Sequence, residues 1–149
     1  MKKDQELIHA LRILSINAPD GRALLAETVA LLQRERPHYT WVGVYLLEGE
    51  ELVLGPFVGK PTPHTRIPLN KGICGAAASS GKTLIVDDVH ADPRYLACSL
   101  ETRSEIVVPI VRAGRVLGEI DIDSDAPAAF TEEDRRLLEA VAEIVAAKL

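Results

Sequence analysis

The spacing of hydrophobic residues changes twice along the chain, and this pattern restricts the possible folds more than any single motif. Apolar residues recur at helical spacing over residues 7–14 and 24–32, and Pro37 ends the second run. They then recur at a spacing of about two residues, which is typical of strands. Helical spacing returns over residues 137–145, after Thr131 and Asp134, which have the spacing of a capping box. The sequence therefore predicts helices at both ends of the chain and strands between them.

The strand-like part divides into several short segments. Strands are predicted at residues 39–47, 52–58, 83–86, 105–111 and 116–123. Two links, residues 48–51 and Ala113-Gly114, have the length of hairpin loops, so the strands that they join are antiparallel. A short helix is predicted over residues 72–80, and a long irregular loop over residues 87–100. The expected fold class is α+β, with helices grouped on a mostly antiparallel sheet.

Size and charge exclude several classes of protein. The 149 residues are expected to form one domain, residues 1–149. The 17 basic and 22 acidic side chains give a net charge of −5 without a basic block, which argues against nucleic-acid or membrane-surface binding. No apolar run approaches the roughly 20 residues of a membrane helix. Two cysteines make no secreted disulfide framework, so a cytoplasmic location is expected.

Carboxylates alternate with isoleucines along the last predicted strand. Glu119, Asp121 and Asp123 share one face of this strand, and Ile120 and Ile122 share the other. Such a row is either a solvated sheet face or a pocket for a cation such as a substrate ammonium, with raised carboxyl pKa values. A further carboxylate, Glu105, begins the neighbouring strand and favours the pocket.

The two cysteines occupy different settings. Cys74 begins the short predicted helix, where it is either a small buried residue or a thiol with a pKa lowered by the helix N-terminus. Cys98 lies in the long loop, where a thiol can be accessible and reactive. Trp41 and Tyr45 share a strand face with Gly43, so the two aromatic rings either pack in the core or wall a pocket.

Two other kinds of site are not expected. Residues 76–83 read AAASSGKT, a relaxed phosphate-loop pattern, but a helix precedes them and a strand follows, which is the reverse of the required order. The four histidines and two cysteines show no pair at short ligand spacing, so no metal site is predicted.

Eight short segments together resemble the free methionine-R-sulfoxide reductases, which have the GAF fold. The resemblance implies a mostly antiparallel sheet of about six strands, with the N- and C-terminal helices packed on one face. The segments are WVGVY (41–45), LGPFVGK (54–60), RIP (66–68), GICG (72–75), DVH (88–90), AC (97–98), SEIVVP (104–109) and DIDS (121–124).

The resemblance also implies roles for individual residues. Cys98 matches the catalytic cysteine, which attacks the sulfoxide and becomes a sulfenic acid, and Cys74 matches a second cysteine able to form a disulfide. The carboxylates Glu105, Asp121 and Asp123 match groups that bind the substrate ammonium and assist protonation of the sulfoxide. The aromatic residues Trp41 and Tyr45 match the walls of the pocket. No cofactor is implied, and thioredoxin or another dithiol is the expected reductant.

The chain departs from this family pattern at two positions. His64 stands where better-studied members have a resolving cysteine, and Ser99 stands where an aspartate usually follows the catalytic cysteine. His64 either neighbours Cys98, whose thiol pKa it would lower when protonated, or is an exposed loop residue. The alternative function is a non-catalytic GAF module that binds and senses a small molecule. The apolar stripes of the terminal helices predict a homodimer.

Overall fold

Two antiparallel hairpins form the centre of a six-stranded sheet. The computed structural model describes residues 2–96 and 100–149. The strands are β1 (Trp41–Glu48), β2 (Glu51–Val58), β3 (Arg66–Pro68), β4 (Leu84–Val86), β5 (Ser104–Arg112) and β6 (Arg115–Ser124), in the order β3-β2-β1-β6-β5-β4. Every neighbouring pair is antiparallel, and the pairing of β1 with β6 joins the two hairpins. The predicted α+β class and antiparallel sheet are confirmed.

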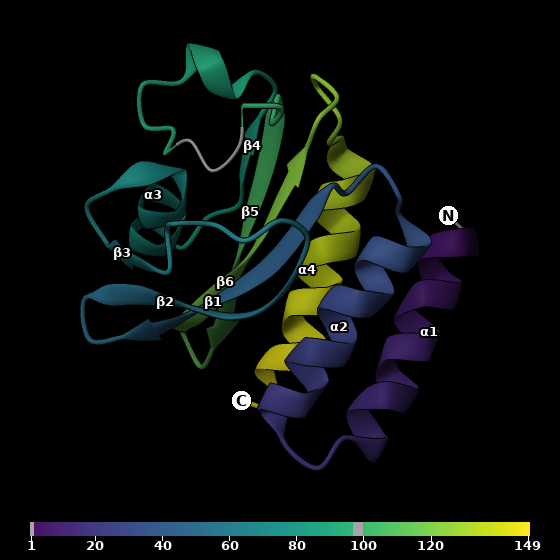
Figure 1. Ribbon diagram of the computed structural model, residues 1–149. Helices are drawn as coiled ribbons and strands as arrows, with labels where there is room; N and C mark the ends of the chain where they lie inside the picture. The colour runs from purple at the N-terminus through teal and green to yellow at the C-terminus, as the bar shows by residue number, and fades with distance from the viewer. Residues whose placement is uncertain (1, 97–99) are drawn as a thin grey trace.

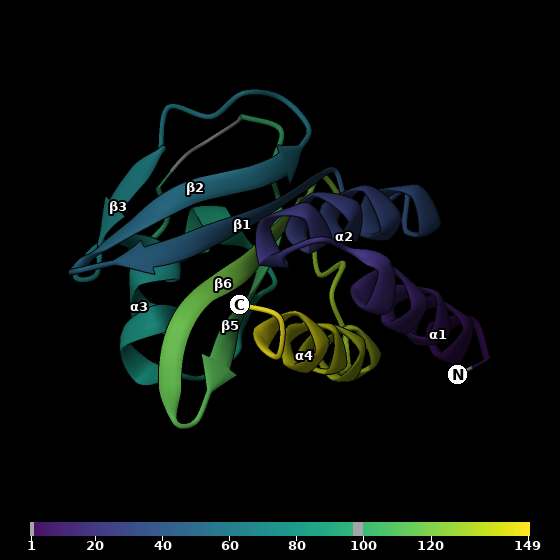
Figure 2. The same ribbon diagram turned by 90° about the horizontal axis from the view of Figure 1, so that it is seen from below.

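The helices are divided unequally between the two faces of the sheet. They are α1 (Lys2–Asn17), α2 (Gly21–Glu35), α3 (Gly72–Ser80) and α4 (Glu132–Ala146). Helix α2 packs on β1 and β2, α4 packs on β5 and β6, and α1 forms an outer layer on α2 and α4 (Figure 1). Helix α3 contacts β3, β5 and β6 on the other face (Figure 2). The terminal helices therefore share one face, as predicted.

Alternation along the strands gives each face its own core. Val42, Val44 and Ile106 point toward α1, α2 and α4 and are fully buried there. Trp41 and Tyr45 point toward α3 and pack with it in a second, smaller core. The central strands are thus buried on both faces, and a polar residue on the α3 side is removed from solvent.

Local signals fix the ends of the helices. The predicted capping box of Thr131 and Asp134 is present at the start of α4. Tyr39 also donates a hydrogen bond to Asp134, which ties α4 to the residues before β1. Helix α3 has the predicted bounds and ends at Gly81 in the left-handed conformation, with φ of 67°. Helix α3 precedes this turn and β4 follows it, which is the order predicted for residues 76–83.

The proline-rich link before α3 contains an element that hydrophobic spacing does not predict. Residues 66–68 form the edge strand β3, which pairs with β2 through Leu52 and Ile67. Three residues are too few to show a hydrophobic period, so the sequence does not predict this strand. Pro68 has no backbone N–H to donate, and burial of Ile67 helps to stabilise the strand. Within its described residues, the long loop contains a 3₁₀ turn, Val89–Ala91. Among the described helices, none is long and apolar enough to cross a membrane.

Candidate functional site

The carboxylate row of β6 lies in the interior, under α3. Glu119 is 0% exposed, and Asp121 and Asp123 are 3% exposed each, while Ile120 and Ile122 pack among the helices on the opposite face. The predicted alternation is confirmed, and the interpretation of the row as a solvated face is wrong. The row is buried because α3 covers this part of the sheet.

Glu105 joins this row from the neighbouring strand, as the sequence suggested. Its position on β5 pairs with Asp123 on β6, and hydrogen bonds link its side chain to Asp121 and Asp123. Two carboxyl groups can share a hydrogen bond only if one of them carries a proton. Glu105 is thus close enough to Asp121 and Asp123 for a proton to be shared within the cluster.

Burial raises the pKa of each carboxyl group on β6. For Glu119 and Asp123 the pKa lies well above the ordinary value, because burial penalises the charge and the neighbouring Asp121 repels it. The pKa of Asp121 is raised by burial, although hydrogen bonds with Glu105 and Cys74 oppose the rise. The row can hold protons at pH values where exposed carboxyls are ionised, so it can donate a proton to a bound molecule.

Cys74 is buried at the start of α3, directly above Asp121. Its Sγ donates a hydrogen bond to Asp121 Oδ2 at 3.4 Å. Burial, followed by the charges of Asp121, Glu119 and Glu105, raises the thiol pKa well above its ordinary value. Of the two interpretations of Cys74, the small buried residue is the one observed, and its pKa is not lowered because burial and the carboxylates outweigh the helix N-terminus. Cys74 is a neutral thiol at rest.

Trp41 and Tyr45 form a wall beside this cluster. Their ring centroids lie 6.5 Å apart, and Trp41 also stacks on Phe57 at 5.7 Å. Hydrogen bonds orient both rings, from Trp41 Nε1 to the carbonyl of Lys60 at 3.0 Å and from the Tyr45 hydroxyl to the carbonyl of His64 at 2.7 Å.

The indole of Trp41 lies flat over Gly43. A Cβ atom at Gly43 would come within 2.3 Å of the indole ring, so only glycine allows this position. The wall of the site is thus set by the backbone as well as by the side chains.

Two small cavities are lined in part by residues of the carboxylate row. One, of about 20 Å³, is lined by Tyr45, His64, Cys74, Glu105 and Asp121 among others. The other, of about 60 Å³, has Trp41, Lys60 and Asp123 in its lining. The structure therefore brings together Trp41, Tyr45, Cys74, Glu105, Asp121 and Asp123 from the sequence prediction. Cys98 and Ser99 lie outside the described residues.

Glu119 was not singled out as a candidate residue, although the alternation placed it in the row. Both of its carboxylate oxygens are buried next to the Cys74 thiol, and no hydrogen bond of ordinary geometry reaches them in the described part of the chain. Asp121 Oδ1 and Asp123 Oδ1 are also buried, and no hydrogen bond of ordinary geometry reaches them in the described part of the chain. Unpartnered buried oxygens are costly, so this site is suited to a ligand that donates hydrogen bonds or carries positive charge.

Known proteins share this architecture. A family model for the GAF domain matches residues 20–149. The free methionine-R-sulfoxide reductase of Escherichia coli is 42% identical over 114 residues, which are 76% of this chain and 68% of that protein. The Neisseria meningitidis free methionine-R-sulfoxide reductase, solved in complex with its substrate, has a TM-score of 0.94 and 39% identity, covering 99% of this chain and 90% of that chain.

A second solved structure is a type II free methionine-R-sulfoxide reductase from Thermoplasma acidophilum. It has a TM-score of 0.83 and 42% identity, and the match covers 85% of this chain and 90% of that chain. The match to the Neisseria meningitidis structure covers nearly all of this chain and so includes the sheet and helices that build the carboxylate site. The chain belongs to the GAF domain family and is homologous to the free methionine-R-sulfoxide reductases.

Proposed function

We propose that this protein reduces free methionine-R-sulfoxide to methionine through a cysteine sulfenic acid. The observation that carries the proposal is the buried cluster of Cys74, Glu105 and Asp121 beside the aromatic wall of Trp41 and Tyr45. Homologues named free methionine-R-sulfoxide reductase, one of them solved with its substrate, support the same function.

The cluster suits the two ends of a free amino acid sulfoxide. The carboxyl groups of Glu105, Asp121 and Asp123 attract an ammonium group, which a residue inside a peptide lacks. Trp41 and Tyr45 offer an apolar wall to the methyl group and polarisable rings to the sulfur. This division of the site explains a preference for the free amino acid over peptide-bound methionine sulfoxide.

Cys98 is the proposed nucleophile. The reactive species is a thiolate, and the raised pKa of Cys74 disfavours that form, so Cys74 is the poorer attacking group. Leu96 and Glu101, close to Cys98 in sequence on either side, line the two cavities, which supports a role for Cys98 at this site.

The reaction transfers the sulfoxide oxygen to Cys98. The thiolate attacks the substrate sulfur while a protonated carboxyl of the Glu105–Asp121 pair protonates the sulfoxide oxygen. Methionine leaves, and Cys98 keeps the oxygen as a sulfenic acid. The Cys74 thiol then condenses with the sulfenic acid, releasing water and forming a disulfide, and an external dithiol such as thioredoxin reduces that disulfide.

Cys74 is the proposed resolving residue because the chain has only two cysteines. His64 occupies the position at which the family resemblance implies a resolving cysteine, and a histidine cannot form a disulfide. His64 lines the smaller cavity together with Cys74. Free thiols require a reducing compartment, so the cytoplasm is the proposed location.

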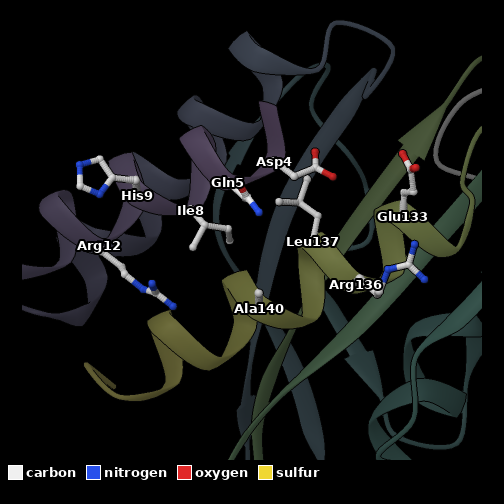
Figure 3. A pocket seen from close by; sticks show the side chains of 9 residues that line it. All are labelled: Asp4, Gln5, Ile8, His9, Arg12, Glu133, Arg136, Leu137 and Ala140. Carbon is white, nitrogen blue, oxygen red and sulfur yellow. The ribbon is translucent and has the colours of Figure 1, made fainter. Parts of the chain in front are cut away.

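A homodimer through the terminal helices is also proposed. Ile13 and Ile16 of α1 are exposed large apolar side chains. A hollow of about 320 Å³ lies between α1 and α4 and is lined by Ile8, Leu137 and Ala140 together with six polar or charged residues, among them Arg12 and Glu133 (Figure 3). The exposed isoleucines of α1 would become buried in an interface between two copies of the protein.

Turnover with separated sulfoxide epimers tests the proposed function. The protein is incubated with the R and S epimers of free and peptide-bound methionine sulfoxide, with thioredoxin or dithiothreitol as reductant. The expected result is turnover of the free R epimer only. Absence of turnover with every reductant would contradict the proposal and favour a module that binds its ligand without reacting.

The two cysteines have separable effects in this assay. Cys98→Ala should abolish methionine formation. Cys74→Ala should release about one equivalent of methionine and then stop with thioredoxin, because the sulfenic acid on Cys98 cannot be resolved internally. Full activity of Cys98→Ala would exclude Cys98 as the nucleophile.

A further inference from the structure

Three potential metal ligands meet in the interior from three different elements. The Cys74 sulfur from α3, a Glu105 oxygen from β5 and an Asp121 oxygen from β6 lie within 4.8 Å of one another. All three residues are buried. Because they are far apart in sequence, no short ligand spacing signals the group, and the sequence alone predicts no metal site.

Their spacing is close to that of a tetrahedral site. Zinc–sulfur and zinc–oxygen bonds of about 2.3 and 2.1 Å at tetrahedral angles separate the sulfur and oxygen by about 3.6 Å. Cys74 Sγ and Asp121 Oδ2 are 3.4 Å apart. A small movement of Glu105 toward this pair would provide the third ligand. The adjoining cavity of about 20 Å³ has room for one water molecule as the fourth.

A second observation points to a positively charged ligand. The Glu119 side chain is 0% exposed, its close polar neighbour is the Cys74 thiol, and no hydrogen bond of ordinary geometry reaches either of its oxygens among the residues that the structure describes. Its charge acts on the Cys74 thiol, so it lies beside the same group. Asp121 Oδ1 is likewise unpartnered. This interior contains more acceptor oxygens than donors to satisfy them.

We propose that Cys74, Glu105 and Asp121 bind a thiophilic divalent cation of the zinc type. On binding, the thiol and any protonated carboxyl ligand release their protons to solvent, and the thiolate in the donor set selects against calcium and magnesium. Glu119, which lies beside Cys74, adds a further carboxyl group next to the cation. If the proposed function also holds, the cation competes with the substrate ammonium and holds Cys74 out of the disulfide.

Cobalt(II) titration of the reduced, chelator-treated protein tests the site without any assay of turnover. Cobalt(II) replaces zinc in such sites, and a thiolate ligand gives an intense charge-transfer absorption. The expected result is one equivalent of cobalt bound with this absorption, and its loss when zinc is added. Absence of binding to the reduced protein would overturn the proposal, whatever the result of the turnover assay.

Matched variants assign the ligands. Cys74→Ala should lose the thiolate absorption and Cys98→Ala should keep it, and the opposite pattern would overturn the proposal. Asp121→Asn and Glu105→Gln should each weaken binding at least about tenfold, since even outer partners of metal ligands contribute that much. Exposed Glu143→Gln serves as the control and should bind like the unmodified protein. Fluorescence of Trp41, the single tryptophan, checks that each variant is folded.

Discussion

The Cys74 thiol donates its hydrogen bond to Asp121 in a buried setting, across 3.4 Å. This bond holds the proton between a thiol and a carboxyl group whose pKa values are both raised by burial. Which group loses its proton first depends on what enters the cavity. A cation favours ionisation of both groups, and a neutral ligand leaves both protonated.

The first prediction concerns the ionisation of Cys74. In the Cys98→Ala background, where Cys74 is the only thiol, the midpoint of iodoacetamide alkylation against pH should lie well above that of a free thiol. Asp121→Asn should move the midpoint down, because it removes one of the charges that oppose the thiolate. A midpoint that Asp121→Asn leaves unchanged would show that the charge of Asp121 does not contribute to the raised thiol pKa.

The second prediction concerns the stability cost of Glu119. Its pKa is raised in the folded protein, so the folded state binds more protons than the unfolded chain above the ordinary pKa of about 4. Stability associated with Glu119 is therefore present at low pH and is lost as the pH rises through the folded-state pKa. Glu119→Gln should raise stability at pH 7 by about 1–2 kcal/mol, or roughly 3–8 °C in Tm.

Thermal unfolding measured between pH 4 and pH 8 checks this prediction. The difference between Glu119→Gln and the unmodified protein should shrink toward pH 4, where Glu119 is protonated. Glu143→Gln, at an exposed position on α4, is the matched control and should change Tm little at either pH. A destabilised Glu119→Gln at pH 7 would mean that Glu119 has a favourable partner.

The third prediction concerns recognition of the substrate ammonium. Asp123→Asn should raise KM for free methionine-R-sulfoxide by roughly 10- to 100-fold, the usual effect of losing a hydrogen bond to a charged group. N-acetyl-methionine-R-sulfoxide has no ammonium and provides the control. The unmodified protein should discriminate against the acetylated substrate more strongly than Asp123→Asn does. Equal discrimination by both proteins would remove Asp123 from ammonium binding.

The fourth prediction uses the contact between Gly43 and Trp41. Gly43→Ala should displace the indole, shift its fluorescence and lower kcat/KM, because the new Cβ overlaps the ring. Trp41→Phe removes the ring atoms nearest that Cβ. Gly43→Ala should therefore cost less in the Trp41→Phe background, and a double-mutant cycle measures the difference. Additive effects in the cycle would argue against the contact.

The fifth prediction tests the proposed homodimer. Ile16 is 78% exposed on α1, and Ile16→Glu should convert a dimer into a monomer at micromolar concentration. Leu100→Glu changes an equally exposed apolar side chain on the loop and should leave the dimer intact. Sedimentation velocity distinguishes the two states. A monomer before any substitution would falsify the dimer.

Hydrophobic spacing predicted most of the fold because each signal was local. The bounds of α3, the capping box at Thr131 and the alternation of Asp121 with Ile122 all depend on neighbours in sequence. Strand β3 was missed because three residues show no period, and its pairing partner Leu52 lies in another strand.

The pKa values of the site residues were harder to predict from the sequence than the identities of those residues. The pKa of Cys74 is raised because α3 lies over β6. This packing brings the thiol against Asp121, which is 47 residues away in the sequence. No local pattern reports that distance. The burial of Glu119 could not be predicted locally either, because it depends on α3, which packs on this face of β6.

The alternation along β6 also protects the fold from mispairing. A strand that slips by one residue exchanges its two faces, so Glu119, Asp121 and Asp123 would enter the apolar layer beneath α2 and α4. Ile120 and Ile122 would then face the carboxyl group of Glu105 and the thiol of Cys74. Such a misfolded state places three acids in hydrocarbon, a large energetic penalty. The residues proposed for reduction of the sulfoxide thus also select the correct strand register during folding.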